Sequence, residues 1–389
     1  MPIPTLFATP RRAIMAVFAA FGTAIGAWAG AIPGVTRNAH IGDYDLGIGI
    51  TLFTIVYVAA MALAGRLARS TGNRSAMLVI IPQAGFATLL LMASASPAVF
   101  FAGLVLFGAT LGSLDVFMNA EGSAIERDLG RRIFVTFHGA ASAGMAVLAI
   151  VSSFVSVATG PLGPALIAAT CLSTAWLATY RHVPARPPAV AAQSAAEARA
   201  HRTPLIIMGL AAGLVIAAET AAVMWSAKLL DERAPALAAF AGLGAAFYGL
   251  CNAALRFRAD GLRHRFGDLP LMMGSLFAAI LGFAALGLSQ DFGPSVAAFA
   301  LVGFGTAPLI PCIFALAAGR VPENRAAAIG FVSAVAGLPR ALAPWLFGWI
   351  AASVSTSFAF SLCAAVLAVA FALAVALRGY GPVRSQRLP

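Results

Sequence analysis

Apolar residues form long, nearly uninterrupted runs along this chain, separated by short polar or basic connectors. Cut at clusters of charged, proline and glycine residues, the sequence contains twelve such runs, each close to the roughly 20 residues that a helix needs to cross a bilayer. The runs cover residues 13–33, 46–65, 76–95, 98–120, 133–157, 162–180, 205–226, 235–256, 269–288, 295–318, 327–352 and 356–377. Because exposed strand edges cannot satisfy their backbone hydrogen bonds in lipid, the pattern predicts an all-α integral membrane protein with twelve transmembrane helices. Pro308 and Pro311 predict a kink in the tenth helix.

A longer connector divides the runs into two sets of six. Residues 181–204 are rich in proline, alanine and arginine and lack apolar periodicity, which indicates a cytoplasmic linker. Residues 1–180 and 205–389 are therefore expected to form an N-terminal and a C-terminal six-helix bundle. The connector GRLARSTGNR at 65–74 also resembles ADGLRHRFGD at 259–268, which occupies the corresponding place in the second set. Two pseudo-symmetric six-helix bundles that face each other across a central cavity are typical of transporters.

Composition agrees with a membrane protein. Of the 389 residues, 61% are hydrophobic and 10% are charged, whereas a soluble chain carries roughly 25% charged residues. The formal net charge is +11, but the basic residues lie in short clusters between apolar runs and not in a basic domain. This distribution indicates a lipid bilayer as the partner and not nucleic acid. The four cysteines lie apart in apolar runs without a CxxC pair, so neither a disulfide framework nor a metal site is predicted, and no cofactor is expected.

The basic residues also predict an orientation. Of the 25 Lys and Arg residues, 21 lie on the side of the two chain termini if the helices alternate in direction. Arg37, Lys228 and Arg233 lie on the other side, and Arg340 lies inside a run. An excess this large predicts a multi-pass protein of the cytoplasmic (inner) membrane with cytoplasmic N and C termini. The run at 13–33 is too long for the apolar core of a signal peptide, so we expect an uncleaved first span.

Two ionisable residues interrupt the fourth and fifth runs. Asp115 and His138 lie where a charge costs at least about 2.5 kcal/mol, so such residues usually face a bundle interior or a water-filled path. Small and polar residues share a helical stripe at spacings of 4, 3, 4 and 3, namely Gly108, Gly112, Asp115, Asn119 and Gly122. His138 and Ser142 form a similar pair at a depth that allows contact with Asp115. Two interpretations stay open: a structural hydrogen bond between these spans, or a site for substrate or protons.

The second half contains two further ionisable residues inside its runs. Arg340 lies near the middle of the eleventh run between Pro339 and Pro344, which free backbone groups to line a cavity. A buried arginine needs a partner, and Glu219 in the seventh run or an anionic group of a substrate are the available types. Arg340 is therefore either a fixed positive charge in a central cavity or part of a purely structural ion pair.

The connector at 65–74 resembles the signature loop of the major facilitator superfamily, in which glycine and small or apolar residues precede Asp-Arg, a second glycine and basic residues. The matching positions are Gly65, Leu67, Ala68, Gly72 and Arg74. Arg69 stands in the place of the usual acid, and Ser70 in the place of the next arginine, so the charge pair of the family's inner gate is not preserved. With the twelve runs and the central linker, the chain resembles a transporter of that superfamily. The resemblance implies a gating loop at Gly65, Arg66, Arg69, Gly72 and Arg74. The alternative is that these arginines only anchor the connector at the cytoplasmic surface.

A narrower tract resembles a bacterial branch related to sugar:proton symporters of the fucose-permease type. LDVFMNAEG at 114–122 contains the Asp-x-x-Met-Asn segment of that branch, and FHGAASAG at 137–144 contains its Phe-His-small segment. Glu219 followed by Trp225 and Ser226 is similar too, although Met224 stands where the branch has an acid. The resemblance implies solute transport without specifying the solute. Candidate residues for substrate binding or coupling are Asp115, Asn119, His138, Glu219, Trp225 and Arg340.

No nucleotide-binding loop is present that could drive transport by ATP, and no catalytic cluster indicates an enzyme. The sequence therefore predicts a secondary active transporter, expected to be a monomeric symporter. It would move a small polar solute such as a sugar, polyol or related organic compound by alternating access, with a proton as the coupling ion. Drug or metabolite efflux within the same superfamily is an alternative, which would need a wide apolar cavity with few polar partners. A transporter-like sensor that binds without flux is another.

Overall fold

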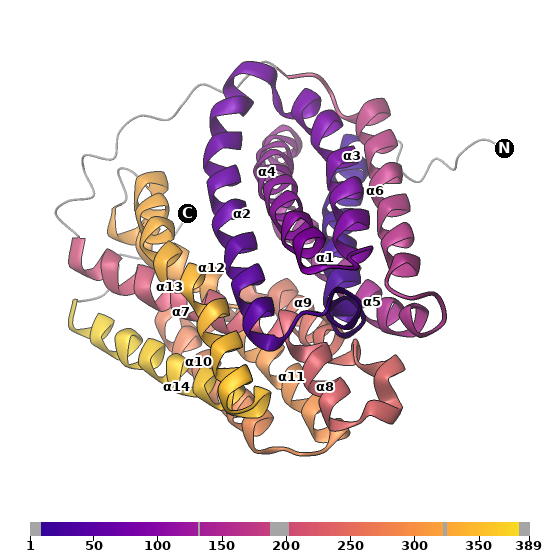
Figure 1. Cartoon of the computed structure of the whole chain (residues 1–389). Helices are drawn as coiled ribbons and strands as arrows, with labels where there is room; N and C mark the ends of the chain where they lie inside the picture. The colour runs from indigo at the N-terminus through magenta and orange to yellow at the C-terminus, as the bar shows by residue number, and fades with distance from the viewer. Residues whose placement is uncertain (1–8, 131–132, 187–201, 322–324, 381–389) are drawn as a thin grey trace.

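The computed structural model describes residues 9–130, 133–186, 202–321 and 325–380 of the chain (Figure 1). Every regular element within these ranges is helical. Twelve of the described helical segments are long and apolar enough to cross a membrane, which confirms the twelve predicted spans. The protein is therefore an all-α integral membrane protein.

The first six spans are continuous helices. They are α1 (Pro10–Ala39), α2 (Asp43–Thr71), α3 (Asn73–Met92), α4 (Pro97–Leu129), α5 (Phe134–Thr159) and α6 (Leu162–His182). Two of them begin with the same local signal, a capping hydroxyl followed by proline: the side chain of Thr9 accepts from the backbone of Arg12, and that of Ser96 from Val99. α4 ends at Gly130, whose left-handed conformation favours glycine.

The last six spans are less regular. They comprise α7 (Arg202–Met224), α8 (Ser226–Arg233), η3 (Pro235–Phe240), α9 (Leu243–Phe266), α10 (Asp268–Leu288), α11 (Phe292–Thr306), α12 (Leu309–Arg320), α13 (Arg325–Ser353), α14 (Thr356–Ala376) and η5 (Leu377–Tyr380). The predicted kink in the tenth span is confirmed, because α11 and α12 are separated at Ala307 and Pro308.

The seventh and eighth spans are separated by a short polar helix. The seventh span ends at Met224, and the eighth begins at Pro235, as predicted, with η3 followed by α9 from Leu243. The short helix α8 lies between the two spans. The charged residues of α8 make this stretch too polar for lipid, and they are Lys228, Asp231, Glu232 and Arg233.

The connector at 65–74 is mostly helical, since α2 continues to Thr71 and α3 begins at Asn73. Gly72 makes the turn with a φ of 75°, and in the second half Gly267 separates α9 from α10 with a φ of 82°. Such positive φ angles favour glycine. The two connectors that resemble each other in sequence thus turn at corresponding glycines, as expected for an internal repeat.

Glycines on α1 allow it to pack backbone to backbone against α5. Gly22, Gly26 and Gly30 follow each other at four-residue spacing on one face of α1, and a Cβ at any of them would collide with a backbone carbonyl of α5. A Cβ at Gly26, for example, would lie 2.9 Å from the Cα of Met145. This contact forms the core of the first six spans.

The helices form two sets, α1–α6 and α7–α14, which Figure 1 shows in indigo to magenta and in pink to yellow. The sets meet mainly along two helix pairs, α2 with α13 and α5 with α9. Gly47 faces Gly348 in the first pair, and Gly242 faces the carbonyl of Ala149 in the second. These interfaces are lined in part by backbone, which lets the sets approach closely. The boundaries of the two bundles at residues 180 and 205 stay a prediction.

The helix assembly has two ends, which we call the linker end and the opposite end. The linker end carries the turn at Gly72, the turn at Gly267 and both termini of the described chain. The opposite end carries the α1–α2 connector at residues 40–42 and the short helix α8.

Candidate functional site in the helix interior

Asp115 on α4 is held by two hydrogen-bond donors. The phenol of Tyr57 on α2 donates to Asp115 Oδ2 at 2.9 Å, and the side-chain amide of Asn119 donates to Asp115 Oδ1 at 2.7 Å. The same amide donates to the backbone carbonyl of Asp115 at 2.8 Å, which fixes its orientation. Within the described residues, the buried oxygen Oδ1 of Asn119 has no partner. The cluster therefore combines an oriented carboxyl group with an unused hydrogen-bond acceptor.

The glycines of the predicted stripe explain why Tyr57 reaches Asp115. A Cβ at Gly108 would lie 2.7 Å from the carbonyl oxygen of Phe53, and a Cβ at Gly112 would lie 2.9 Å from the Cα of Tyr57. The absence of these Cβ atoms lets α2 and α4 approach at the depth of the carboxyl group. At Gly108 and Gly112 the stripe thus packs against the backbone of α2.

Arg340 approaches this cluster from the other set of helices. Its Cζ lies 5.4 Å from the centroid of the Tyr57 ring, a cation–π contact between α13 and α2. The predicted pairing of Arg340 with Glu219 is wrong, because the arginine beside Glu219 is Arg256 of α9. Since α13 packs against α2 as well as α7, its arginine can face either helix. It faces Tyr57 on α2.

Glu219 on α7 belongs to a second cluster. Tyr248 on α9 donates its hydroxyl to Glu219 Oε1 at 3.0 Å, and Arg256 Nη2 lies 3.9 Å from the same oxygen. The hydroxyl of Thr306 lies 3.4 Å from that of Tyr248, and the amide of Asn252 donates to Thr306 at 3.3 Å. The Glu219 side chain is only 15% exposed. This network joins α7, α9 and α11 around one carboxyl group.

Sequence reasoning misses Tyr57, Tyr248 and Arg256. Arg256 was assigned to the cytoplasmic surface with the other basic residues, but it reaches the carboxyl of Glu219 inside the helices. The two tyrosines occupy corresponding places in the folded halves, because the backbone of Tyr57 faces Gly112 and the backbone of Tyr248 faces Gly303.

Three residues beyond these two glycines, the halves diverge. Asp115 follows Gly112 and accepts from Tyr57, whereas Thr306 follows Gly303 and contacts Tyr248. The acid of the second half is supplied from α7 by Glu219. The two clusters therefore share a tyrosine and a glycine contact but place their carboxyl groups on different helices.

His138 does not contact Asp115 in the described structure, which corrects the predicted contact. Its ring packs edge-on against Phe18 and Phe134, with centroid separations of 5.2 and 5.0 Å. α5 packs mainly on α1 and has little contact with α4. The histidine therefore lies in an aromatic setting beside α1.

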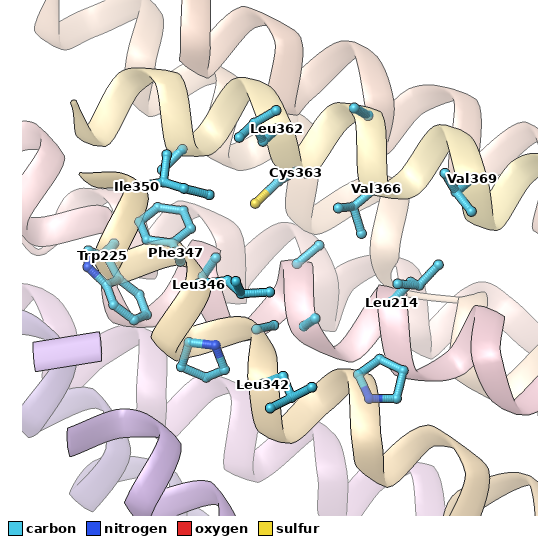
Figure 2. A pocket seen from close by; sticks show the side chains of 18 residues that line it. Leu214, Trp225, Leu342, Leu346, Phe347, Ile350, Leu362, Cys363, Val366 and Val369 are labelled. Atoms are coloured by element: carbon cyan, nitrogen blue, oxygen red, sulfur yellow. The ribbon is translucent and has the colours of Figure 1, made fainter. Parts of the chain in front are cut away.

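Trp225 lies at the junction of α7 and α8 and is fully buried. Its ring packs against Phe347 with a centroid separation of 4.5 Å. Both residues line an apolar cavity of about 450 Å³ between α7, α13 and α14 (Figure 2). Aliphatic side chains such as Leu214, Leu346 and Val366 form most of its wall. Neither carboxyl cluster lines this cavity, so Trp225 is placed apart from Asp115 and Glu219.

The predicted gating loop is described only in part. Gly65, Arg66 and Arg69 lie in a stretch whose side chains are outside the described residues. Arg74 donates to the backbone carbonyl of Tyr180 at 2.7 Å and lies 5.7 Å from the centroid of its ring, so it joins α3 to α6.

Acidic residues at the linker end of α4 bind an arginine that follows α6. Nε of Arg186 donates to Glu121 at 2.8 Å, and its Nη2 pairs with Asp128. These hydrogen bonds, first that to Asp128 and then that to Glu121, raise the pKa of Arg186 above its ordinary value. Glu121 is fully buried, so this arginine neutralises a charge that would otherwise be costly.

Comparison with known proteins finds a family model that matches part of the chain and relatives that match most of it. Residues 234–388 match the family described as "Major Facilitator Superfamily". The protein named "Uncharacterized transporter y4wD" from Sinorhizobium fredii is 27% identical over 388 residues, with 95% of this chain and 98% of the relative covered. "Membrane protein MosC" from Rhizobium meliloti is 26% identical over 348 residues, with 89% of this chain and 84% of the relative covered.

Solved structures share the fold. A crystal structure of a variant of the nucleoside transporter NupG has a TM-score of 0.80 at 16% identity and covers 95% of this chain and 100% of the other. A variant of the E. coli fucose:proton symporter FucP has a TM-score of 0.61 at 14% identity and covers 97% and 100%. At these identities the likeness establishes the fold alone.

Proposed function

We propose that this chain is a transporter of the major facilitator superfamily and not an enzyme, and that it moves a small polar solute by alternating access and couples this movement to a proton. A sugar, a polyol or a related organic compound is the class of solute that fits best. The observation that carries the proposal is the pair of carboxyl groups, Asp115 and Glu219, each bound by a tyrosine inside its own set of helices.

A polar solute is supported by the hydrogen-bonding groups of these clusters. Asn119 has an acceptor oxygen without a partner, and among the described side chains Arg340 makes no ion pair but contacts the ring of Tyr57. A buried polar group without a partner costs free energy, which a solute with several hydroxyl groups can recover by binding there. The solutes named for the two structural neighbours, a nucleoside and fucose, are polar as well.

A proton is supported by the chemistry of the two acids. A carboxyl group in a membrane interior is charged only when it is paired or hydrogen-bonded, and its protonation changes with its surroundings. If the helix sets expose Asp115 to each side of the membrane in turn, the same group can take up a proton on one side and release it on the other. Arg340 comes from the opposing set, so its distance from Asp115 would change during that motion.

Orientation and assembly complete the proposal. The excess of basic residues at the linker end favours cytoplasmic termini and a location in the cytoplasmic (inner) membrane. We propose a monomer, with residues 1–180 and 205–389 as its two moving bundles and the linker between them. The loop of Gly65, Arg66, Arg69, Gly72 and Arg74 is proposed to support closure of the linker end.

One observation favours the alternative of drug or metabolite efflux. The cavity beside Trp225 is apolar and has a volume of about 450 Å³, as a lipophilic solute would require. It lies away from both carboxyl clusters, and for that reason the polar solute is preferred.

The test is a binding screen followed by a flux measurement. Sugars, polyols, amino acids, organic anions and lipophilic drugs are added to the purified protein, and the shift in thermal stability is recorded. Each compound that binds is then offered to proteoliposomes with and without a pH gradient. Accumulation of a polar compound that depends on the gradient supports the proposal. Accumulation of lipophilic compounds alone would favour efflux, and binding without any flux would indicate a sensor.

A further inference from the structure

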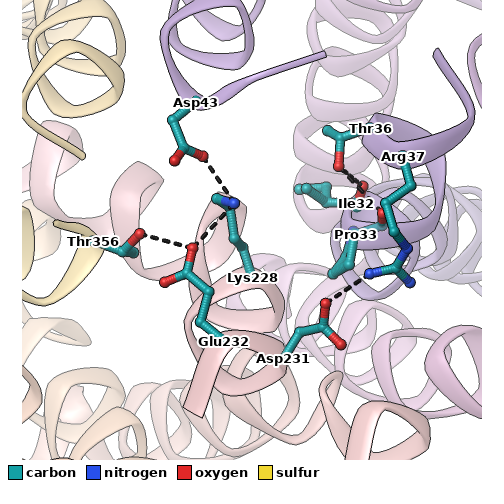
Figure 3. A network of polar contacts seen from close by, with 9 residues as sticks. All are labelled: Ile32, Pro33, Thr36, Arg37, Asp43, Lys228, Asp231, Glu232 and Thr356. Atoms are coloured by element: carbon teal, nitrogen blue, oxygen red, sulfur yellow. Dashed lines mark hydrogen bonds and ion pairs between the residues drawn. The ribbon is translucent and has the colours of Figure 1, made fainter. Parts of the chain in front are cut away.

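The two helix sets are joined at the opposite end by a network of charged side chains around α8 (Figure 3). Nζ of Lys228 lies 2.9 Å from Asp43 at the start of α2 and 3.0 Å from Glu232, one turn further along α8. The hydroxyl of Thr356 on α14 donates to Glu232 at 3.1 Å. Lys228 is therefore shared between one acid of the other helix set and one acid of its own set.

A second ion pair crosses between the sets beside the first. Nη1 of Arg37 on α1 lies 2.7 Å from Asp231 on α8. The Arg37 side chain is 64% exposed, so water screens this pair and weakens it. The Lys228 and Asp43 side chains are only 25% and 21% exposed. Among the described side chains, both ion pairs that join the two sets lie at this end, and both involve α8.

Lys228 remains charged in this setting. Burial by itself lowers the pKa of Lys228, but the hydrogen bond to Asp43 and the charges of Glu232 and Asp43 outweigh it, and the pKa is raised above its ordinary value. Lys228 is therefore a fixed positive charge at physiological pH.

We propose that α8 is the gate of the opposite end, and that Lys228 works by giving up Asp43 and keeping Glu232 when that end opens. The inference rests on the proposed alternating access. It adds the element that holds one end shut and assigns a separate role to each of the two acids.

Lys228 and Asp43 each keep another stabilising interaction when the ion pair between them breaks. Lys228 keeps the carboxylate of Glu232, which Thr356 holds in place from its own helix set. Asp43 is the first residue of α2, where the unpaired backbone N–H groups of the helix N-terminus stabilise a negative charge. Opening thus leaves neither charge without compensation, so the pair can break and form again in each cycle.

This arrangement predicts opposite effects for the two acids. Asp43→Asn removes a contact that exists only when the end is closed, so the open population should rise about fivefold, as for a partly exposed ion pair. Glu232→Gln leaves the ion pair between Lys228 and Asp43 intact. It removes the carboxylate that Lys228 needs as a partner when the opposite end is open. The open population should therefore fall. Asp45→Asn is the matched control, because Asp45 carries the same charge in the same helix turn and makes no described ion pair, and it should change nothing.

The measurement is the distance distribution between two spin labels in the full-length protein in lipid nanodiscs, without solute. The spin labels are attached to noncanonical amino acids that replace Ala95 and Gln290, so the native cysteines are not labelled. Both positions are exposed at the opposite end, and they lie in different helix sets. A long-distance population that grows with Asp43→Asn and shrinks with Glu232→Gln is the expected result. Shifts in the same direction, or no shift with either substitution, would overturn the proposal. Because no solute or flux is involved, this outcome is independent of whether the proposed solute class is right.

Discussion

At the scale of single residues, the identities of the two acids were predictable but their partners were not. Asp115 and Glu219 stand out because a charge inside an apolar run is rare. Their partners Tyr57 and Tyr248 are not charged, and a tyrosine in a membrane helix is ordinary, so only the folded structure reveals that each binds a carboxyl group. The sequence contains no information that separates Arg256 from Arg340 as the partner of Glu219 without the packing of α9 against α7.

The corrected pairing predicts a specific coupling. Glu219→Ala and Arg256→Ala should be non-additive in the free energy of unfolding, with an interaction of about 0.5 to 3 kcal/mol, because each substitution removes the same contact. Glu219→Ala combined with Arg340→Ala should be additive, since Arg340 contacts Tyr57 instead. Denaturation of the purified variants in detergent measures both cycles. Coupling between Glu219 and Arg340 with none between Glu219 and Arg256 would restore the pairing expected from sequence.

At the scale of helices, apolar runs predict where each transmembrane helix lies but not the residues at which it begins and ends. The twelve spans follow from length and hydropathy alone, because a helix must fill the bilayer. The eighth span begins at Pro235 as expected, but hydropathy cannot detect the turn at Gly242 that separates η3 from α9 within it. Glycine spacing, in contrast, marks the face of α4 that packs against α2 at Gly108 and Gly112.

The space available for a side chain at each glycine predicts a difference in stability between two glycine-to-alanine substitutions. Gly26→Ala would place a methyl group against the backbone of Met145 on α5, so the protein should lose about 1 to 3 kcal/mol of stability. Gly85→Ala on α3 meets nothing within 4 Å and should be neutral or slightly stabilising, because alanine favours helix. Thermal unfolding of the two variants in the same detergent compares them directly. Equal melting temperatures would mean that the close contact of α1 with α5 is not formed.

At the scale of the whole molecule, the sequence predicted the architecture and the transporter class, because the repeat, the linker and the distribution of basic residues are all properties of the chain. The contacts between the two helix sets could not be predicted. They join residues such as Asp43 with Lys228 and Tyr57 with Arg340, which are far apart in sequence and have no shared pattern. These contacts join the two sets, and they place Arg340 of the second set over the ring of Tyr57 of the first.

The central claim, that solute movement is coupled to a proton through Asp115, is tested most directly by proton flux into vesicles. Proteoliposomes that contain a pH-sensitive dye are given a solute identified by the binding screen, with no imposed gradient. The account predicts that the parent protein acidifies the lumen as solute enters. Asp115→Asn keeps the size of the side chain but cannot exchange a proton, so it should move labelled solute without acidification. Acidification by the Asn variant at the parent's rate per solute, or solute entry into parent vesicles without any proton movement, would contradict the account.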